Sequence, residues 1–131
     1  MATLRKSITL SVSPAQLWDA VRDVGAAHRR LAPGFVTNCA LADGVRTVTF
    51  ANGMTVREPI VSIDDAARRV AYTAEGGRAK HYAAAMQVMD GDDGSSRLSW
   101  QVDLLPDDMA PAIESMMVQG IQVIRRHFDG M

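Results

Sequence analysis

Two charged residues, Arg46 and Glu58, lie in predicted strands among apolar residues of the same phase. Side chains alternate between the two faces of a strand, so Arg46 shares a face with Val48, and Glu58 shares one with Val56. If these apolar neighbours point to the interior, both charges point there too. A buried carboxylate needs a partner, and an arginine can supply two parallel hydrogen bonds to it.

Tyr82 adds a third polar side chain to an otherwise apolar strand face. Arg46, Glu58 and Tyr82 could form the polar end of an apolar pocket and orient a carbonyl, hydroxyl or carboxylate. Alternatively, Arg46 and Glu58 form a solvated cross-strand pair, and Tyr82 belongs to an ordinary core. Burial raises the pKa of a glutamate and a nearby arginine lowers it, so the sequence leaves the protonation state of Glu58 open.

Other chemistry has little support in the sequence. The acidic loop at 90–94 has Gln101 at the twelfth position, where a calcium loop has glutamate, and it predicts a hairpin turn. Cys39 is the only cysteine, so no intrachain disulfide can form, and a buried inert thiol is expected. No phosphate-binding glycine loop or dinucleotide fingerprint occurs, so no cofactor is expected. A metal site is not expected either, because metal-ligand spacing is missing around His28, His81 and His127.

The composition predicts one soluble domain over residues 1–131. The chain is 47% hydrophobic and has a formal net charge of −1, which gives no electrostatic basis for binding nucleic acid. No run approaches the ~18 apolar residues of a membrane span, so no integral membrane association is expected. The N-terminus leads into a strand pattern without a signal-peptide core, and the single cysteine suits a reducing cytoplasm.

The stretch 106–128 predicts a long amphipathic helix that lies across a sheet. Asp107 and Asp108 suit its N-terminus, and Gly130 supplies a stop. Gly120 interrupts the apolar stripe, which indicates either close backbone packing or space for a ligand. At ~100° per residue, one wide face carries Ile113, Met116, Met117, Gly120, Ile121, Val123, Ile124 and Phe128.

The rest of the chain predicts an antiparallel sheet. An alternating strand over residues 4–12 precedes a capping box at 13–16, a first helix and a short second helix over 26–31. Short turns then join six further strands, which indicates a meander. The fold class is α+β, with one sheet of about seven strands curved around the last helix. The six strands are predicted over 35–42, 45–51, 54–63, 69–75, 80–89 and 97–104.

This order of elements resembles the START-like or Bet v 1-like (SRPBCC) superfamily, most closely its polyketide cyclase/dehydrase and lipid-transport-like branch and the plant abscisic-acid receptors. The resemblance implies a helix-grip fold that encloses an apolar cavity for a small hydrophobic ligand. It also implies an inward arginine and glutamate, at Arg46 and Glu58. Its motifs are Ser13-Pro14 with Leu17-Trp18, Asn38-Cys39, Gly44-Val45-Arg46, Arg57-Glu58, Ile63-Asp64-Asp65, Arg69-Val70-Ala71-Tyr72, His81-Tyr82 and Leu98-Ser99-Trp100.

Two functions follow from these features. The favoured one is a carrier or sensor of a small hydrophobic or aromatic ligand, in a monomer or weak homodimer. The alternative is a cyclase/dehydratase-like enzyme that uses Glu58 or Tyr82 as acid or base. A third possibility is a structural protein with a filled core, in which Met86, Met116 and Met117 occupy the space. Tyr72 and Trp100 could be either pocket walls or core residues. The expected ligand-binding residues are Arg46, Glu58, Tyr72, Tyr82, Met86, Ile113, Met116, Met117 and Gly120.

Overall fold

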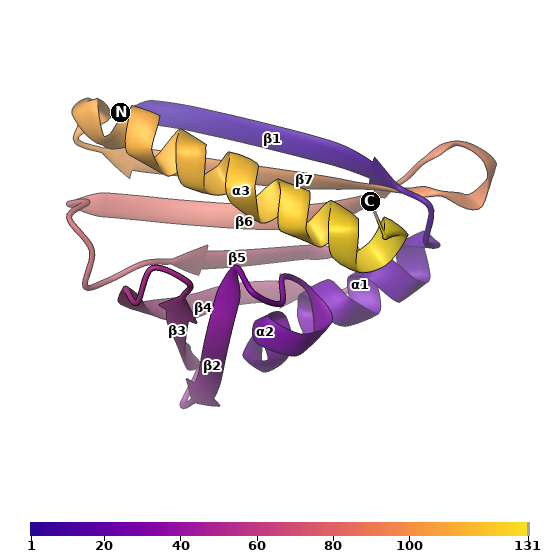
Figure 1. Cartoon of the computed structure of the whole chain (residues 1–131), viewed down its shortest axis with the longest axis horizontal. Coiled ribbons are helices and arrows are strands. Elements are labelled where there is room, and N and C mark those ends of the chain that lie inside the picture. The colour runs from indigo at the N-terminus through magenta and orange to yellow at the C-terminus, as the bar shows by residue number, and fades with distance from the viewer. Residues whose placement is uncertain (131) are drawn as a thin grey trace.

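Seven antiparallel strands form one sheet in the order β1-β7-β6-β5-β4-β3-β2, in a computed structural model that describes residues 1–130 (Figure 1). Strands β2 to β7 pair with their neighbours along the chain, and β1 joins the sheet beside β7. This meander confirms the predicted α+β fold. The strands are β1 Ala2–Leu10, β2 Val36–Ala42, β3 Val45–Phe50, β4 Thr55–Asp64, β5 Arg69–Thr73, β6 His81–Asp90 and β7 Ser96–Leu105.

The longest helix, α3 (Ala110–Asp129), runs over one face of the sheet, and the shorter helices lie beside its C-terminal end (Figure 1). The helices α1 (Pro14–Arg22) and α2 (Ala27–Arg30) follow β1 and are joined by the 3₁₀ turn η1 (Val24–Ala26). Two more 3₁₀ turns, η2 (Asp92–Gly94) and η3 (Asp107–Met109), flank β7. No helix within residues 1–130 combines the length and the apolar character that crossing a bilayer requires.

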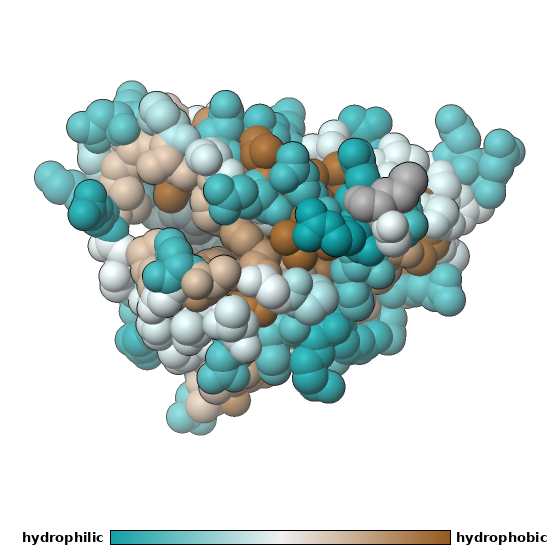
Figure 2. Space-filling view, in the orientation of Figure 1, coloured by the Kyte–Doolittle hydropathy of each residue, from teal (hydrophilic) through white to brown (hydrophobic). Residues whose placement is uncertain are grey.

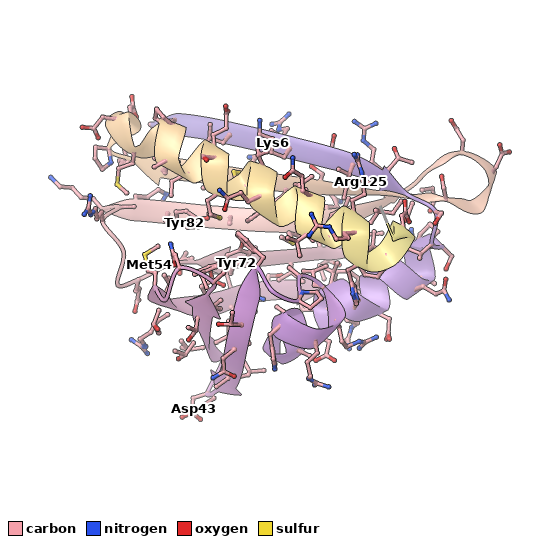
Figure 3. All side chains as sticks on the ribbon, viewed as in Figure 1. Lys6, Asp43, Met54, Tyr72, Tyr82 and Arg125 are labelled. Carbon is pink, nitrogen blue, oxygen red and sulfur yellow. The ribbon has the colours of Figure 1, made fainter. Side chains whose placement is uncertain are left out.

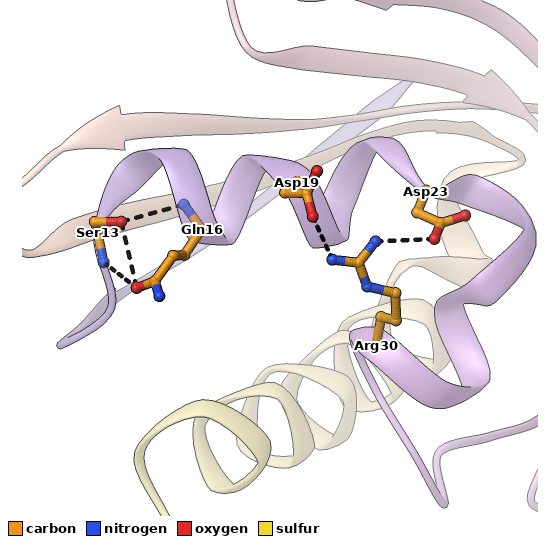
Figure 4. Close-up of polar contacts among 5 residues, drawn as sticks. All are labelled: Ser13, Gln16, Asp19, Asp23 and Arg30. Carbon is orange, nitrogen blue, oxygen red and sulfur yellow. Dashed lines mark hydrogen bonds and ion pairs between the residues drawn. The ribbon is translucent and has the colours of Figure 1, made fainter.

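Side-chain bonds fix the start of α1 and its packing against α2 (Figure 4). The predicted capping box is present: the Gln16 backbone N–H donates to Ser13 Oγ at 3.2 Å, and the Ser13 N–H donates to Gln16 Oε1. Arg30 of α2 then reaches back to α1, with ion pairs to Asp19 Oδ2 at 2.5 Å and to Asp23 Oδ2 at 2.9 Å. These ion pairs hold α1 and α2 together beside β2.

Helix α3 begins and ends close to the predicted positions, but its N-terminus is built differently. Asp107 and Asp108 lie in η3, and no side chain caps the first turn after Met109. The prediction that these carboxylates cap the helix is therefore wrong, because the extra 3₁₀ turn separates them from the first turn of α3. At the other end Gly130 adopts φ 72°, and its N–H donates to the Arg126 carbonyl.

Strand register brings the two predicted charges together. Arg46 of β3 lies directly opposite Glu58 of β4. The register of β4 shifts only between Ile60 and Ser62, beyond Glu58, so the alternation that places Glu58 on the inner face is intact.

Candidate ligand-binding site

Arg46 and Glu58 form a buried ion pair between sheet and helices. The Arg46 Nε donates to Glu58 Oε1 at 2.7 Å, and the Arg46 Nη1 donates to the Val24 carbonyl at 3.2 Å. Their residues are 8% and 6% exposed, respectively. The solvated-pair alternative is therefore wrong, and the pair belongs to the interior.

An aromatic layer supports the arginine. The guanidinium carbon of Arg46 lies 4.7 Å from the centroid of the Tyr72 ring, a distance typical of a cation–π contact. The Trp100 Nε1 donates to the Tyr72 hydroxyl at 3.1 Å, which fixes the ring beneath the guanidinium. Arg46 is thus held by a carboxylate, a backbone carbonyl and an aromatic face, so its side chain has little freedom to reorient.

Burial dominates the ionisation of the site. It raises the pKa of the Glu58 carboxyl, and Arg46 offsets part of that rise. Burial alone would lower the pKa of Arg46, but the Glu58 carboxylate compensates, and the pKa lies above its ordinary value. Burial also raises the pKa of the Tyr72 and Tyr82 phenols, so both are neutral at pH 7 and can donate hydrogen bonds.

Two cavities adjoin this polar cluster. A small inner cavity of about 50 Å³ lies against Arg46, Tyr72 and Trp100. A large outer cavity of about 520 Å³ lies between the N-terminal half of α3 and the turns at 51–54 and 74–79. Figure 2 shows a hollow between α3 and the lower strands on this face, and Figure 3 shows Tyr82 and Met54 on the same side of the molecule.

Phe35 and Phe50 separate the inner cavity from the outer one. Their rings meet edge to face with centroids 5.4 Å apart, and both residues line both cavities. Glu58, Tyr82 and Met116 also border both, whereas Arg46 borders only the inner one. A molecule in the outer cavity therefore meets the Glu58 carboxyl and the Tyr82 phenol, while Arg46 lies behind them.

A family model described as "Polyketide cyclase / dehydrase and lipid transport" matches residues 1–129. The chain belongs to this family. No curated protein matches the sequence. The match thus confirms the resemblance, and the description covers both enzymes and lipid carriers.

Solved structures agree with the family on the fold. A protein from Bacillus thuringiensis superposes with a TM-score of 0.87 at 18% identity, covering 97% of this chain and 98% of the other. The protein Ara h 8.0201 gives 0.74 at 21% identity, with 99% of each chain covered. A START superfamily protein from Mycobacterium smegmatis gives 0.73 at 11% identity, covering 98% and 94%. At identities this low, the superpositions show that the fold is shared and nothing further about function.

The structure places eight of the nine expected ligand-binding residues beside a cavity. Glu58, Tyr82 and Met116 border both cavities, Ile113 borders the outer one, and Arg46, Tyr72, Met86 and Gly120 border the inner one. Met117 borders neither and is fully buried. Its assignment to the cavity is wrong, because α3 turns by about 100° per residue and points Met117 into the filled core beside Met116.

Several cavity residues were missed in the sequence. Phe50 and Val56 border the outer cavity and share strand faces with Arg46 and Glu58, so parity could have identified them. Arg78 and Ala79 border it from the turn before β6, where no periodic pattern exists to guide a prediction. The tertiary fold, and not a local sequence pattern, brings a loop of this kind to the site.

Gly120 is a close-packing position rather than open space for a ligand. A Cβ there would lie 3.1 Å from Phe35 Cε2 and 3.1 Å from Trp100 Cζ3. The glycine thus lets α3 approach both rings. The sequence left both explanations of this glycine open, and the contact with the two rings favours the first.

The substitution Gly120→Leu is consequently expected to lower the free energy of unfolding by roughly 1–3 kcal/mol through overpacking. The larger branch must displace Phe35 or Trp100, and Trp100 is held by its bond to Tyr72. Urea melts of wild type and variant measure the difference. An unchanged midpoint together with lost ligand uptake would show instead that the branch enters a void.

Proposed function

We propose that the protein binds a small, largely apolar molecule in the outer cavity, with Glu58 and Tyr82 contacting its polar group. The observation that carries this proposal is the cavity itself. Its volume of about 520 Å³ lies within the range of roughly 300–1,000 Å³ of small-molecule sites. Its lining is mostly apolar, and a few polar groups meet at the inner end.

The inner end favours a hydrogen-bond donor on the ligand. Glu58 Oε1 already accepts from Arg46, and within residues 1–130 no side chain or backbone group donates to Glu58 Oε2. Glu58 borders the outer cavity, so a ligand hydroxyl or amide N–H at this point could donate a hydrogen bond to its carboxyl group. The Tyr82 phenol can add a donor or an acceptor beside it.

A cyclase/dehydratase-like enzyme is the second candidate, because burial raises the pKa of the Glu58 carboxyl toward neutrality, which suits acid–base chemistry in a cavity. The ion pair with Arg46 favours the binding role, since it commits one carboxylate oxygen to a structural bond. Native mass spectrometry of protein purified from its source tests the proposal directly, by detecting a co-purified small molecule. A cytoplasmic location and a monomeric or weakly dimeric state stay predictions from the sequence.

The substitution Ile113→Trp is expected to weaken binding of the neutral apolar dye N-phenylnaphthylamine roughly tenfold, because the larger indole would take up part of the outer cavity that the dye needs. Val118→Trp is the matched control, since Val118 lies on the same helix, is 38% exposed and borders neither cavity. Fluorescence titrations of both variants give the two affinities. Equal affinities in the two variants would place the dye outside this cavity.

A further inference from the structure

The mouth of the outer cavity carries one cation, Arg78. It lies on the turn between β5 and β6, with Gly77 and Ala79 as cavity-lining neighbours. Glu58 and Arg78 are the two charged residues among those that border the cavity. Glu58 is buried at the inner end, whereas Arg78 is exposed at the rim. The cavity therefore has a carboxyl group at its inner end and a guanidinium at its entrance.

The Arg78 guanidinium is available to a ligand. Glu75, the carboxylate on the same turn, pairs with Arg57 at 3.1 Å. Within residues 1–130 no carboxylate lies within ion-pair distance of Arg78. Ser115 and Gln119 of α3 line the same cavity and add uncharged polar groups. An anionic group at this rim would gain a charge-assisted hydrogen bond and keep part of its hydration.

The inner end disfavours an anion. Glu58 presents a carboxyl to the cavity, and the Arg46 charge behind it is already engaged with Glu58 and the Val24 carbonyl. A second carboxylate placed there would meet a like group in a desolvated site, which disfavours its charged form. The inner end thus favours an uncharged hydrogen-bond donor, whereas the rim favours an anion.

We propose that the preferred ligand is an amphipathic acid: an apolar body with an uncharged hydrogen-bond donor at Glu58 and a carboxylate, sulfonate or similar anion at Arg78. This inference rests on the proposed function and assigns Arg78 as a residue that determines specificity. It predicts the orientation of the ligand, with the charged end at the mouth.

Two dyes that share one skeleton test the anion site. Anilinonaphthalene sulfonate is N-phenylnaphthylamine with an added sulfonate, so the ratio of their affinities isolates the charge. Arg78→Gln is expected to weaken the sulfonate dye roughly fivefold and to leave the neutral dye unchanged, because a partly exposed charge contact is modest. Arg78→Lys should recover part of the loss. Added salt should weaken the sulfonate dye more in wild type than in Arg78→Gln.

Lys80→Gln is the matched control, because Lys80 is an exposed cation on the same turn that does not border the cavity. It should change either affinity less than about twofold. Equal effects of Arg78→Gln and Lys80→Gln on the sulfonate dye would overturn the anion site while leaving the cavity as the binding site. Failure of wild type to bind either dye would overturn both this inference and the proposed function.

Discussion

Glu58→Gln and Arg46→Met should each lower the free energy of unfolding by about 3–5 kcal/mol, and the double variant should lose much less than the sum. Glu58→Gln leaves the buried Arg46 guanidinium without its countercharge, and Arg46→Met leaves the buried Glu58 carboxyl without its donor. The double change removes both charges from a site that is less than one-tenth exposed. The Arg46→Met change also removes the contact with the Tyr72 ring, so it should be the more damaging of the two.

Denaturant melts of the wild type, two single variants and the double variant measure this coupling. Arg57→Met provides a comparison, because Arg57 pairs with Glu75 at 3.1 Å but both side chains are more than half exposed. That surface pair should contribute about 0–1 kcal/mol. Additive losses below about 0.5 kcal/mol at Arg46 and Glu58 would contradict the buried pair described above.

Met117→Ala should lower the free energy of unfolding by about 2–5 kcal/mol, whereas its neighbour Met116→Ala should cost clearly less. Met117 is fully buried in a filled region, so truncation leaves a new void there. Met116 is partly exposed and already borders both cavities, so its truncation enlarges space that exists.

The two variants should also differ in ligand uptake. Met116→Ala is expected to change the affinity for apolar dyes, because the wall of the outer cavity moves outward. Met117→Ala should leave that affinity nearly unchanged as long as the protein is folded. Thermal melts and dye titrations on the same samples give both quantities. A reversal, with Met116→Ala the less stable, would mean that the cavity is filled in solution.

The two-residue alternation of the strands was sufficient to predict the sheet and the inward direction of the Arg46 and Glu58 side chains. Strand alternation is rigid, so the apolar neighbours of Arg46 and Glu58 determined the direction of both side chains. The only nearby irregularity in β4 lies beyond Ile60 and does not reverse the face of Glu58. The capping box at Ser13 was equally readable, since its two bonds form within four consecutive residues.

Features that depend on tertiary packing could not be predicted in this way. Met116 and Met117 occupy the same predicted stripe, and the packing of α3 on the sheet decides that Met116 borders the cavities while Met117 is fully buried. Arg78 lies on a turn whose direction no sequence period specifies. The separation of the cavity into two parts also depends on Phe35, which precedes β2 and packs on Gly120 from a distant part of the chain.

The three contacts around Arg46 have a consequence for the kinetics of exchange. The floor of the site is ordered before any ligand arrives, so binding loses little conformational entropy there. The entrance is different, because Met54 is 48% exposed and Arg78 projects from a turn that contributes few buried contacts. The loss of side-chain and loop freedom on ligand binding is therefore concentrated at the rim. Rim residues should influence the rates of ligand entry and escape more than the residues of the floor do.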